Sequence, residues 1–308
     1  MSQTLSSIVV PVYRTRSVLH ELAKQVRQVF REINADYELI FVDDSGDGAS
    51  WDVLLQLHAS DANVKIIRLD QNYGQHNALM CGFRHASGQN IITLDDDLQY
   101  SPGDIPRLIR ELNESGADVV YGIPQKKLYS HFRKIGSFVY NKLFRMIFRV
   151  HSRQKVSSFR VIRKSIVDKI LRFERPNPNI NILLAKTTEK WGSLIIQHKI
   201  RYEGQSYYTF RKLTRFFIAG LIADSPLSIQ AALWGLGLVL TGGLIALWGF
   251  VTWTFMPEIL PGQLLKGVSM TLWILGVAFA FNIFGEYLRQ ILECIFKKTQ
   301  YQIYEKHI

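Results

Sequence analysis

The stretch Asn90-Ile-Ile-Thr-Leu-Asp-Asp-Asp97 decides how the first half of this chain is interpreted. Its apolar, β-branched start predicts a buried strand, and its end places three carboxylates where that strand emerges. Alternate side chains of an extended segment point the same way, so Asp95 and Asp97 can share one ligand while Asp96 turns aside. Mg²⁺ binds one or two carboxylates together with phosphate oxygens. The stretch predicts a divalent-metal site, with an acidic turn before the next helix as the alternative.

Other short β-branched runs end in Gly, Asp or Pro and predict strands, and apolar residues at helical spacing lie between them. The repeated strand–helix alternation predicts an α/β fold, doubly wound around a mixed, mainly parallel sheet. The expected strands are Ser6 to Tyr13, Tyr37 to Asp43, Val64 to Leu69, Asn90 to Asp95 and Asp118 to Tyr121, and the expected helices are Ser17 to Ile33, Ser50 to Ala59, Tyr73 to Ala86 and Asp104 to Asn113.

Groups that could bind a ligand follow other strands of this sheet. Tyr13 ends the first strand, Asp43 and Asp44 close the second, and Gly74-Gln75 opens a helix whose N-terminus would attract phosphate. Ligands of such sheets bind beyond the carboxyl ends of the strands. Each group alone could be explained by the residue preferences of turns and helix starts. Because all of them occur at one edge of the sheet, the sequence predicts a ligand-binding site there. The domain contains neither a Gly-x-Gly-x-x-Gly nor a Walker A loop, which argues against a dinucleotide dehydrogenase and a P-loop NTPase.

The formal charge of +11 predicts an anionic partner. Basic residues gather in 126–175 and 199–215, just ahead of an apolar segment, so the sequence favours a membrane surface over nucleic acid. Residues 130–150 and 208–222 are predicted to be amphipathic interfacial helices. The only cysteines, Cys81 and Cys294, cannot build a disulfide framework, which fits a reducing compartment.

Residues 227–285 are almost free of charge, and the predicted hairpin covers 227–288. Within them, Ile229 to Phe255 and Val268 to Leu288 each supply the roughly 20 apolar residues that span a bilayer. We therefore expect two transmembrane helices, with a buried hairpin of a soluble protein as the alternative. Domain boundaries follow: a catalytic domain over 1–215, the membrane hairpin, and a basic tail over 289–308.

The connector from Met256 to Gln263 carries no Lys or Arg, whereas basic residues flank the hairpin on both sides. The positive-inside rule therefore predicts that both ends of the hairpin are cytoplasmic. The start, Met1 to Ser7, lacks the charged and apolar regions of a secretory signal, so the catalytic domain is expected in the cytoplasm as well. The expected location is the inner or plasma membrane.

The chain resembles the family 2 glycosyltransferases of GT-A fold, and within them the membrane-anchored polyprenyl-phosphate glycosyltransferases related to dolichol-phosphate mannose synthase. The likeness covers residues 6 to about 215, and the hairpin follows as in the anchored branch. It is carried by five stretches: Ile8-Val-Val-Pro-Val-Tyr13, Glu38-Leu-Ile-Phe-Val-Asp-Asp44, Asn72-Tyr-Gly-Gln-His-Asn-Ala78, Leu94-Asp-Asp-Asp-Leu-Gln99 and Arg201-Tyr-Glu-Gly-Gln-Ser206.

The resemblance implies a nucleotide-sugar donor, Mg²⁺ or Mn²⁺, a polyprenyl phosphate acceptor and a homo-tetramer. Asp95 and Asp97 would form the Asp-x-Asp pair of the catalytic centre, with Asp97 as the main metal ligand. The implied donor-binding residues are Pro11, Tyr13, Asp43, Asp44, Gly74, Gln75, Asp95, Asp96 and Gln99. The residues expected at the donor or acceptor phosphate are Arg133, Arg160 and Arg201.

This sequence departs from the family pattern at three places. Ser158 stands where many relatives have an Asp that has been assigned as the base, Tyr207 stands where many have Lys, and the order of Ser45-Gly46-Asp47 is unusual. A phosphate monoester, with a second pKa of about 6, is already an anionic nucleophile at neutral pH and needs little help from a base. Ser158 therefore favours a lipid phosphate acceptor.

The sequence thus predicts an inverting transferase that moves a sugar from a nucleotide diphosphate to a polyprenyl phosphate, expected to be undecaprenyl phosphate, at the cytoplasmic membrane face. One alternative is transfer to a hydroxyl of a lipid-linked saccharide. Another, of a different class, is a non-catalytic membrane adaptor that kept a nucleotide-sugar fold. That adaptor would be expected to lose its metal-binding carboxylates, whereas Asp95 and Asp97 are intact.

Overall fold

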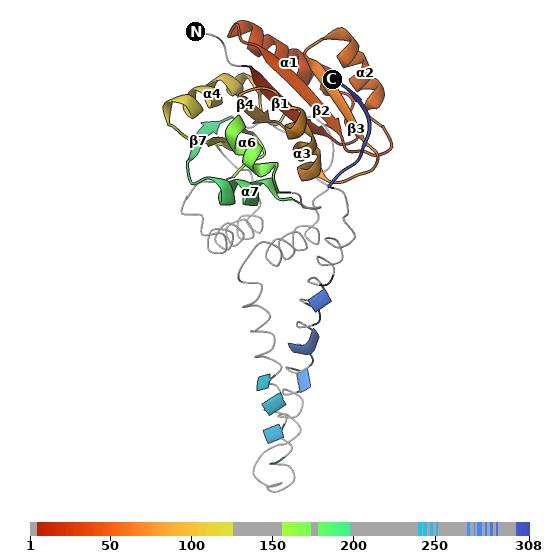
Figure 1. Cartoon of the computed structure of the whole chain (residues 1–308), viewed down its shortest axis with the longest axis vertical. Helices are drawn as coiled ribbons and strands as arrows, with labels where there is room; N and C mark the ends of the chain where they lie inside the picture. The colour runs from red at the N-terminus through yellow and green to blue at the C-terminus, as the bar shows by residue number, and fades with distance from the viewer. Residues whose placement is uncertain are drawn as a thin grey trace. The chain divides into compact units, whose positions relative to one another are not determined.

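A computed structural model of the chain describes residues 5–125, 156–173, 178–197 and 300–308, together with scattered helical positions between 240 and 288 (Figure 1). The chain divides into two compact units, one of Met1–Tyr207 with Lys298–Ile308 and the other of Tyr208–Lys297. Both predicted amphipathic helices, and most of the predicted membrane hairpin, lie outside the described residues. Among those described, no helix is both long and apolar enough to cross a bilayer.

The first unit is built on an eight-stranded sheet with the order β7-β5-β6-β4-β1-β2-β3-β8. Strands β1 to β4 are mutually parallel, whereas β6 and β8 run antiparallel to their neighbours. The strand bounds are β1 (Ser6–Val12), β2 (Tyr37–Asp43), β3 (Val64–Leu69), β4 (Asn90–Thr93), β5 (Val119–Pro124), β6 (Arg160–Arg163), β7 (Trp191–Ile196) and β8 (Ile303–His307).

Helices cover both faces of this sheet (Figure 1). The central strands β1 and β2 are buried along their whole length, as expected for parallel strands covered on both sides. Alternate residues serve opposite layers: Ile8 and Val10 pack with α1, α2 and α4, and Val9 packs with α3, α6 and α7. The helix bounds are α1 (Leu19–Glu32), α2 (Trp51–Ser60), α3 (Gln75–His85), η1 (Pro102–Asp104), α4 (Ile105–Glu114), α6 (Lys164–Ile170) and α7 (Ile180–Thr187).

The structure confirms the mixed, mainly parallel α/β sheet and each strand and helix predicted before residue 122, with ends that shift by a few residues. The fourth strand is shorter than predicted, because it ends at Thr93 instead of Asp95. Five elements were not predicted from the sequence: β6, α6, α7, β7 and β8. In particular, the end of the predicted basic tail is strand β8, which pairs with β3. Its five residues are too few and too polar to stand out as a strand.

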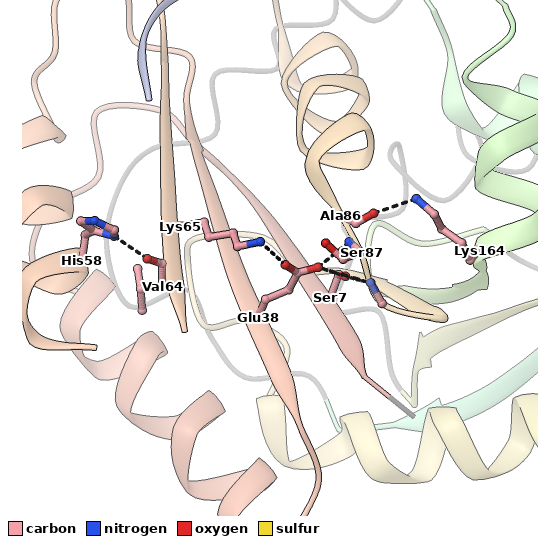
Figure 2. Close-up of polar contacts among 9 residues, drawn as sticks. Ser7, Glu38, His58, Val64, Lys65, Ala86, Ser87 and Lys164 are labelled. Carbon is pink, nitrogen blue, oxygen red and sulfur yellow. Dashed lines mark hydrogen bonds and ion pairs between the residues drawn. The ribbon is translucent and has the colours of Figure 1, made fainter. Parts of the chain in front are cut away.

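A buried carboxylate ties the strands together at the edge where β1 and β2 begin (Figure 2). The Glu38 side chain accepts hydrogen bonds from Lys65 Nζ at 2.6 Å, from the Ser7 hydroxyl, and from the backbone N–H groups of Ser87 (2.6 Å) and Gly88 (3.3 Å). Burial opposes ionisation, but the hydrogen bonds from Lys65, Ser7 and Ser87 prevail and lower the pKa of Glu38. One side chain therefore fixes the starts of three strands and the turn before β4.

Replacing Glu38 with Gln should destabilise this unit by about 3 kcal/mol, because Lys65 would keep a half-buried charge without its partner. Because the folded-state pKa of Glu38 is lowered, its contribution is present above the unfolded pKa of about 4.5 and is lost as the pH falls through the folded value. Urea unfolding at pH 7 and pH 4 tests both statements. Glu114→Gln, at an exposed position of α4, is the matched control, and equal midpoints for the two variants would contradict the prediction.

Candidate functional site

The carboxyl ends of β1, β2 and β4 meet at one edge of the sheet, because these strands are parallel and adjacent. Val12 is the register partner of Asp43, and the Asp44 N–H still donates to the Val12 carbonyl at 2.9 Å. On the other side, the Leu94 N–H donates to the Val9 carbonyl at 3.2 Å. Pairing thus continues to the last residue of each strand, and the acidic groups that follow emerge together.

Asp95 is the centre of the site. Its Oδ1 accepts a hydrogen bond from Gln75 Nε2 at 2.7 Å, and its Oδ2 accepts one from the Ser158 hydroxyl at 2.5 Å. Gln75 begins α3, and Ser158 precedes β6, whose antiparallel pairing sets Arg160 opposite Thr93. The Thr93 hydroxyl also donates to the Ser158 carbonyl. Three segments that are distant in sequence therefore converge on one carboxylate.

The surroundings of Asp95 disfavour its negative charge. Burial raises the pKa of Asp95 to about 6, and the neighbouring Asp97 and Asp96 carboxylates add to the rise, although Ser158 and Arg160 oppose it. A cation bound against this group would relieve both the desolvation and the repulsion between carboxylates.

The other two carboxylates of the cluster accept hydrogen bonds from two different backbone segments. Asp96 Oδ2 accepts the Tyr13 backbone N–H at 3.2 Å and so joins the ends of β4 and β1. Asp97 Oδ1 accepts the Gln99 N–H at 3.1 Å. Between Asp97 and Gln99, Leu98 has a φ of +54°, a conformation that is uncommon for a residue with a side chain and that concentrates at functional sites.

Asp43 and Asp44, at the end of β2, are both buried. Asp43 Oδ1 accepts hydrogen bonds from the Ser45 N–H (3.0 Å) and hydroxyl (2.5 Å), whereas its buried Oδ2 has no hydrogen-bond partner within the part of the chain that the structure describes. Asp44 Oδ1 accepts the Tyr73 N–H at 2.7 Å. A buried acceptor without a partner is costly, and a ligand N–H or O–H would satisfy it.

Burial also raises the pKa of Asp44 to about 6, even though the backbone N–H groups of Tyr73 and Gly74 lower it. Gly74 caps the start of α3 with a φ of +88°, and a Cβ added there would have no described atom within 4 Å. Tyr13 is 39% exposed, while Pro11 is buried within β1. Within the part of the chain that the structure describes, the start of α3 is therefore open, beside the buried carboxylates of Asp43 and Asp44.

Arg160 is enclosed by protein, with only 1% of its surface exposed. Its Nη1 donates to Asn181 Oδ1 at 2.5 Å, and its guanidinium lies 5.9 Å from the centre of the Tyr121 ring. Burial, and then the charge of Arg160, lower the pKa of His76 to about 4, so that imidazole is neutral at pH 7. Arg160 is thus held by buried protein groups, and its charge favours the ionised form of Asp95.

Not every predicted site residue can be placed. Arg133 and Arg201 lie outside the described residues. Two further groups contact site residues and were not predicted from the sequence, namely the Asn181 side chain and the Tyr73 N–H. For Asn181 a signal existed, since Asn179 before an apolar run is a typical N-cap, and its side chain does accept the N–H groups of Asn181 and Ile182.

Among the described residues, no three His, Cys, Asp or Glu side chains converge on one metal position. The Asp95 and Asp97 carboxylates alone are too few to enclose a divalent ion, and Mg²⁺ commonly completes such a site with water and substrate phosphates. The donor set therefore fits a metal that binds together with a phosphate ligand.

The sheet resembles solved structures of glucosyl-3-phosphoglycerate synthase from Mycobacterium tuberculosis. One is 15% identical with a TM-score of 0.52, and the match covers 72% of this chain and 81% of that one. Another, in complex with Mg²⁺ and uridine-diphosphate, is 14% identical with a TM-score of 0.53 over 72% and 79%. A third, with Mn²⁺, uridine-diphosphate-glucose and phosphoglyceric acid, is 14% identical with a TM-score of 0.51 over the same shares.

At such identities these structures show a shared fold. The model of the family described as "Glycosyl transferase family 2" matches residues 7–171, which hold every described carboxylate of the site and are more than half of the 308-residue chain. The chain belongs to glycosyl transferase family 2.

Proposed function

We propose that this protein is an inverting glycosyltransferase that moves a sugar from a nucleotide diphosphate to a polyprenyl phosphate, with undecaprenyl phosphate as the expected acceptor. The observation that carries this proposal is the constellation around Asp95: Gln75 from the start of α3 and Ser158 from before β6 hold one carboxylate at the strand edge. The buried Asp44, at the end of β2, is linked to the same helix start, because its Oδ1 accepts the Tyr73 N–H just before α3.

The donor would lie across the carboxyl edge of the sheet. Asp43 and Asp44 offer buried acceptors for a base N–H or a ribose hydroxyl, and Pro11 and Tyr13 would line the same pocket. The diphosphate would lie near the start of α3, where the helix N-terminus attracts phosphate. The residues assigned to the diphosphate side are Gly74, Gln75, Asp96 and Gln99.

Asp97, with Asp95 beside it, would hold Mg²⁺ or Mn²⁺. When bound, such an ion stabilises the negative charge of the departing nucleoside diphosphate. Similar structures contain Mn²⁺ or Mg²⁺ together with uridine-diphosphate, which supports both the cofactor and the donor class. Asp95 and Asp97 would orient the diphosphate, so that an acceptor on the opposite side of the sugar attacks in line and inverts the anomeric carbon.

The hydrogen bond of Ser158 supports a phosphate acceptor. Ser158 donates its hydroxyl proton to Asp95, so its role is to fix that carboxylate and not to accept a proton. An acceptor phosphate is already anionic at neutral pH and can attack without a base. We assign Arg133 and Arg201 to the acceptor phosphate, and the enclosed Arg160 to the support of Asp95 from behind.

The apolar segment 227–288 supports a membrane location. At its described helical positions large apolar side chains are exposed, such as Leu244 (65%), Trp248 (64%) and Phe281 (71%), and lipid would cover them. Strand β8 belongs to the same sheet as β1 to β7, so the chain before and after segment 208–297 lies on one side of any membrane. An even number of membrane-spanning helices, such as the predicted two, would return the chain to the same side. We place the catalytic unit and both termini in the cytoplasm, because basic residues flank the apolar segment on both sides. A homo-oligomer is proposed from the family resemblance alone.

The acceptor is tested by incubating detergent-purified protein with a panel of radiolabelled nucleotide sugars, undecaprenyl phosphate, and Mg²⁺ or Mn²⁺. We expect label in the lipid fraction, lost on chelation and reduced at least about 100-fold in Asp97→Ala. Asp52→Ala, at an exposed position of α2, is the matched control. Donor hydrolysis without lipid labelling would point to a saccharide hydroxyl as acceptor, and no turnover of any donor would favour the adaptor.

Ser158→Ala separates a positioning role from that of a base. Loss of a general base costs about 10²- to 10⁴-fold in rate. Loss of one hydrogen bond to Asp95 should cost about tenfold or less, because the Gln75 bond remains. We therefore expect Ser158→Ala to keep most of its activity towards lipid phosphate, measured as the rate constant of sugar transfer in single-turnover experiments. A loss above about 10²-fold would assign the base to this position.

Asp44 should make donor binding sensitive to pH. Its pKa is raised to about 6 in the folded protein, so below that pH it becomes protonated, loses its charge and accepts hydrogen bonds from the donor more weakly. The affinity ratio between wild type and Asp44→Asn, measured for UDP and GDP by calorimetry, should fall as the pH drops from 8 to 5. This ratio cancels the ionisation of the ligand and of Asp95. A ratio that does not change with pH would remove Asp44 from donor binding.

Because the pKa of Asp44 is raised by folding, its ionisation weakens the donor-free fold as the pH rises through about 6. Asp44→Asn should therefore unfold at a higher temperature than wild type at pH 8, and this difference should vanish at pH 4. Asp52→Asn, which alters an exposed carboxylate of α2, is the control for both measurements.

A further inference from the structure

Residues 44–48, here called the donor loop, follow β2 and contain Asp44. Arg68 of β3 lies beside this loop, because its Cα is the register partner of Asp43. Arg68 Nη2 donates to the Gly46 carbonyl at 3.4 Å. Burial raises the pKa of Asp43, and the nearby Arg68 charge counters that effect. One guanidinium therefore touches the loop and faces the carboxylate at its base.

The two glycines of the donor loop show how closely it packs on its surroundings. Gly48 has a φ of +69°, and a Cβ there would lie 2.6 Å from Arg68 Cζ. Gly46 has a φ of +74°, and a Cβ there would lie 2.8 Å from Gln71 Cα. Both positions need glycine for the backbone conformation, and Gly46 needs it also for the space, because its neighbours there are backbone atoms. The Arg68 guanidinium therefore packs directly against the donor loop at Gly48.

The C-terminal strand contacts the same guanidinium through an irregularity in its pairing. Arg68 is the register partner of Glu305 and Leu69 that of Ile303, which leaves Tyr304 as an extra residue in β8. Such a bulge re-aims a side chain, and bulges are enriched next to active sites. The Arg68 guanidinium lies 4.7 Å from the centre of the Tyr304 ring, within the range of a cation–π interaction.

The strand that carries Tyr304 is anchored on both sides of it. The Asp70 N–H donates to the Gln302 carbonyl at 3.2 Å, and Tyr301 packs against the core beside α3. Towards the chain end, the His307 ring lies 5.5 Å from that of His58 in α2. The bulge is thus held in a fixed place on β3.

We propose that Arg68 is a positioning residue for donor binding, held by Tyr304 of the C-terminal strand and itself holding the donor loop so that Asp43 and Asp44 meet the nucleoside. This inference rests on the proposed donor site. It assigns a role in the donor site to the last residues of the chain, which follow the apolar segment. It also separates the two halves of the reaction, since Arg68 acts on donor affinity and not on the transfer step or the acceptor.

The test compares Tyr304→Leu, Tyr304→Phe, Arg68→Lys and Arg68→Met in the full chain. Loss of an exposed cation–π contact should raise the donor KM about three- to fivefold in Tyr304→Leu, with kcat and the acceptor KM unchanged. Tyr304→Phe keeps the ring and should match wild type. Arg68→Lys keeps the charge but loses the planar group, so its donor KM should rise at least as much as that of Tyr304→Leu.

Two controls distinguish positioning from simple stability. Lys306→Gln changes an exposed residue of the same strand and should leave the donor KM unchanged. In the double variant of Arg68→Met with Tyr304→Leu, the two effects on donor KM should be less than additive, because both remove one contact. Additive effects, or losses that follow the melting temperature and affect kcat, would overturn the inference.

Calorimetric titration with UDP and GDP keeps this test independent of turnover. If wild type transfers no sugar but binds one of these nucleotides more tightly than Tyr304→Leu does, the acceptor proposal fails and the role of Arg68 stands. If wild type transfers sugar and Tyr304→Leu has the wild-type affinity, the role of Arg68 fails and the proposed function stands. If wild type binds neither nucleotide, the donor site and the inference both fail.

Discussion

The parallel pairing of β1 with both β2 and β4 is the constraint on which the rest of this structure depends. Seven residues of β1 are matched to Tyr37–Asp43 on one side, and its first four to Asn90–Thr93 on the other. A shift of one residue would turn every side chain to the opposite face. The register therefore sets both hydrophobic layers and the point where each strand ends. The Glu38 carboxylate fixes the beginnings of these strands, and their ends present the acidic groups.

The acidic edge is a site prepared for a cation. Burial raises the pKa values of Asp43, Asp44 and Asp95, so the donor-free protein holds its carboxylates in surroundings that disfavour their charge. Holding these carboxylates ionised lowers the stability of the donor-free fold. Binding of a divalent ion with a nucleotide diphosphate would offset that loss. The hydrogen bonds of Ser158 and Gln75 are what keep Asp95 oriented in the meantime. Family membership fixes the class of chemistry, and the hydrogen bond from Ser158 to Asp95 supports the phosphate acceptor that we propose.

The two antiparallel strands make the contacts that a purely parallel sheet would lack. Strand β6 enters beside β4 and brings Ser158 to Asp95, and β8 covers the edge of β3 and brings Tyr304 to Arg68. In each case a residue from the second half of the chain contacts a side chain from the first half: Ser158 contacts Asp95, and Tyr304 contacts Arg68. Strand β8 also covers an edge that would otherwise be open to pairing with another chain. The donor side of the site thus depends on residues that follow the apolar segment.

The sequence by itself determined the alternation of strands and helices before residue 122, the acidic strand end and the family, because hydrophobic period and local motifs are properties of neighbouring residues. Tertiary structure alone decided that Ser158 bonds to Asp95, that Arg160 is enclosed by Asn181 and Tyr121, and that the chain end returns to β3. The reason is physical. These contacts join residues far apart in sequence through strand pairing, and no local pattern in β6 or β8 specifies the partner strand.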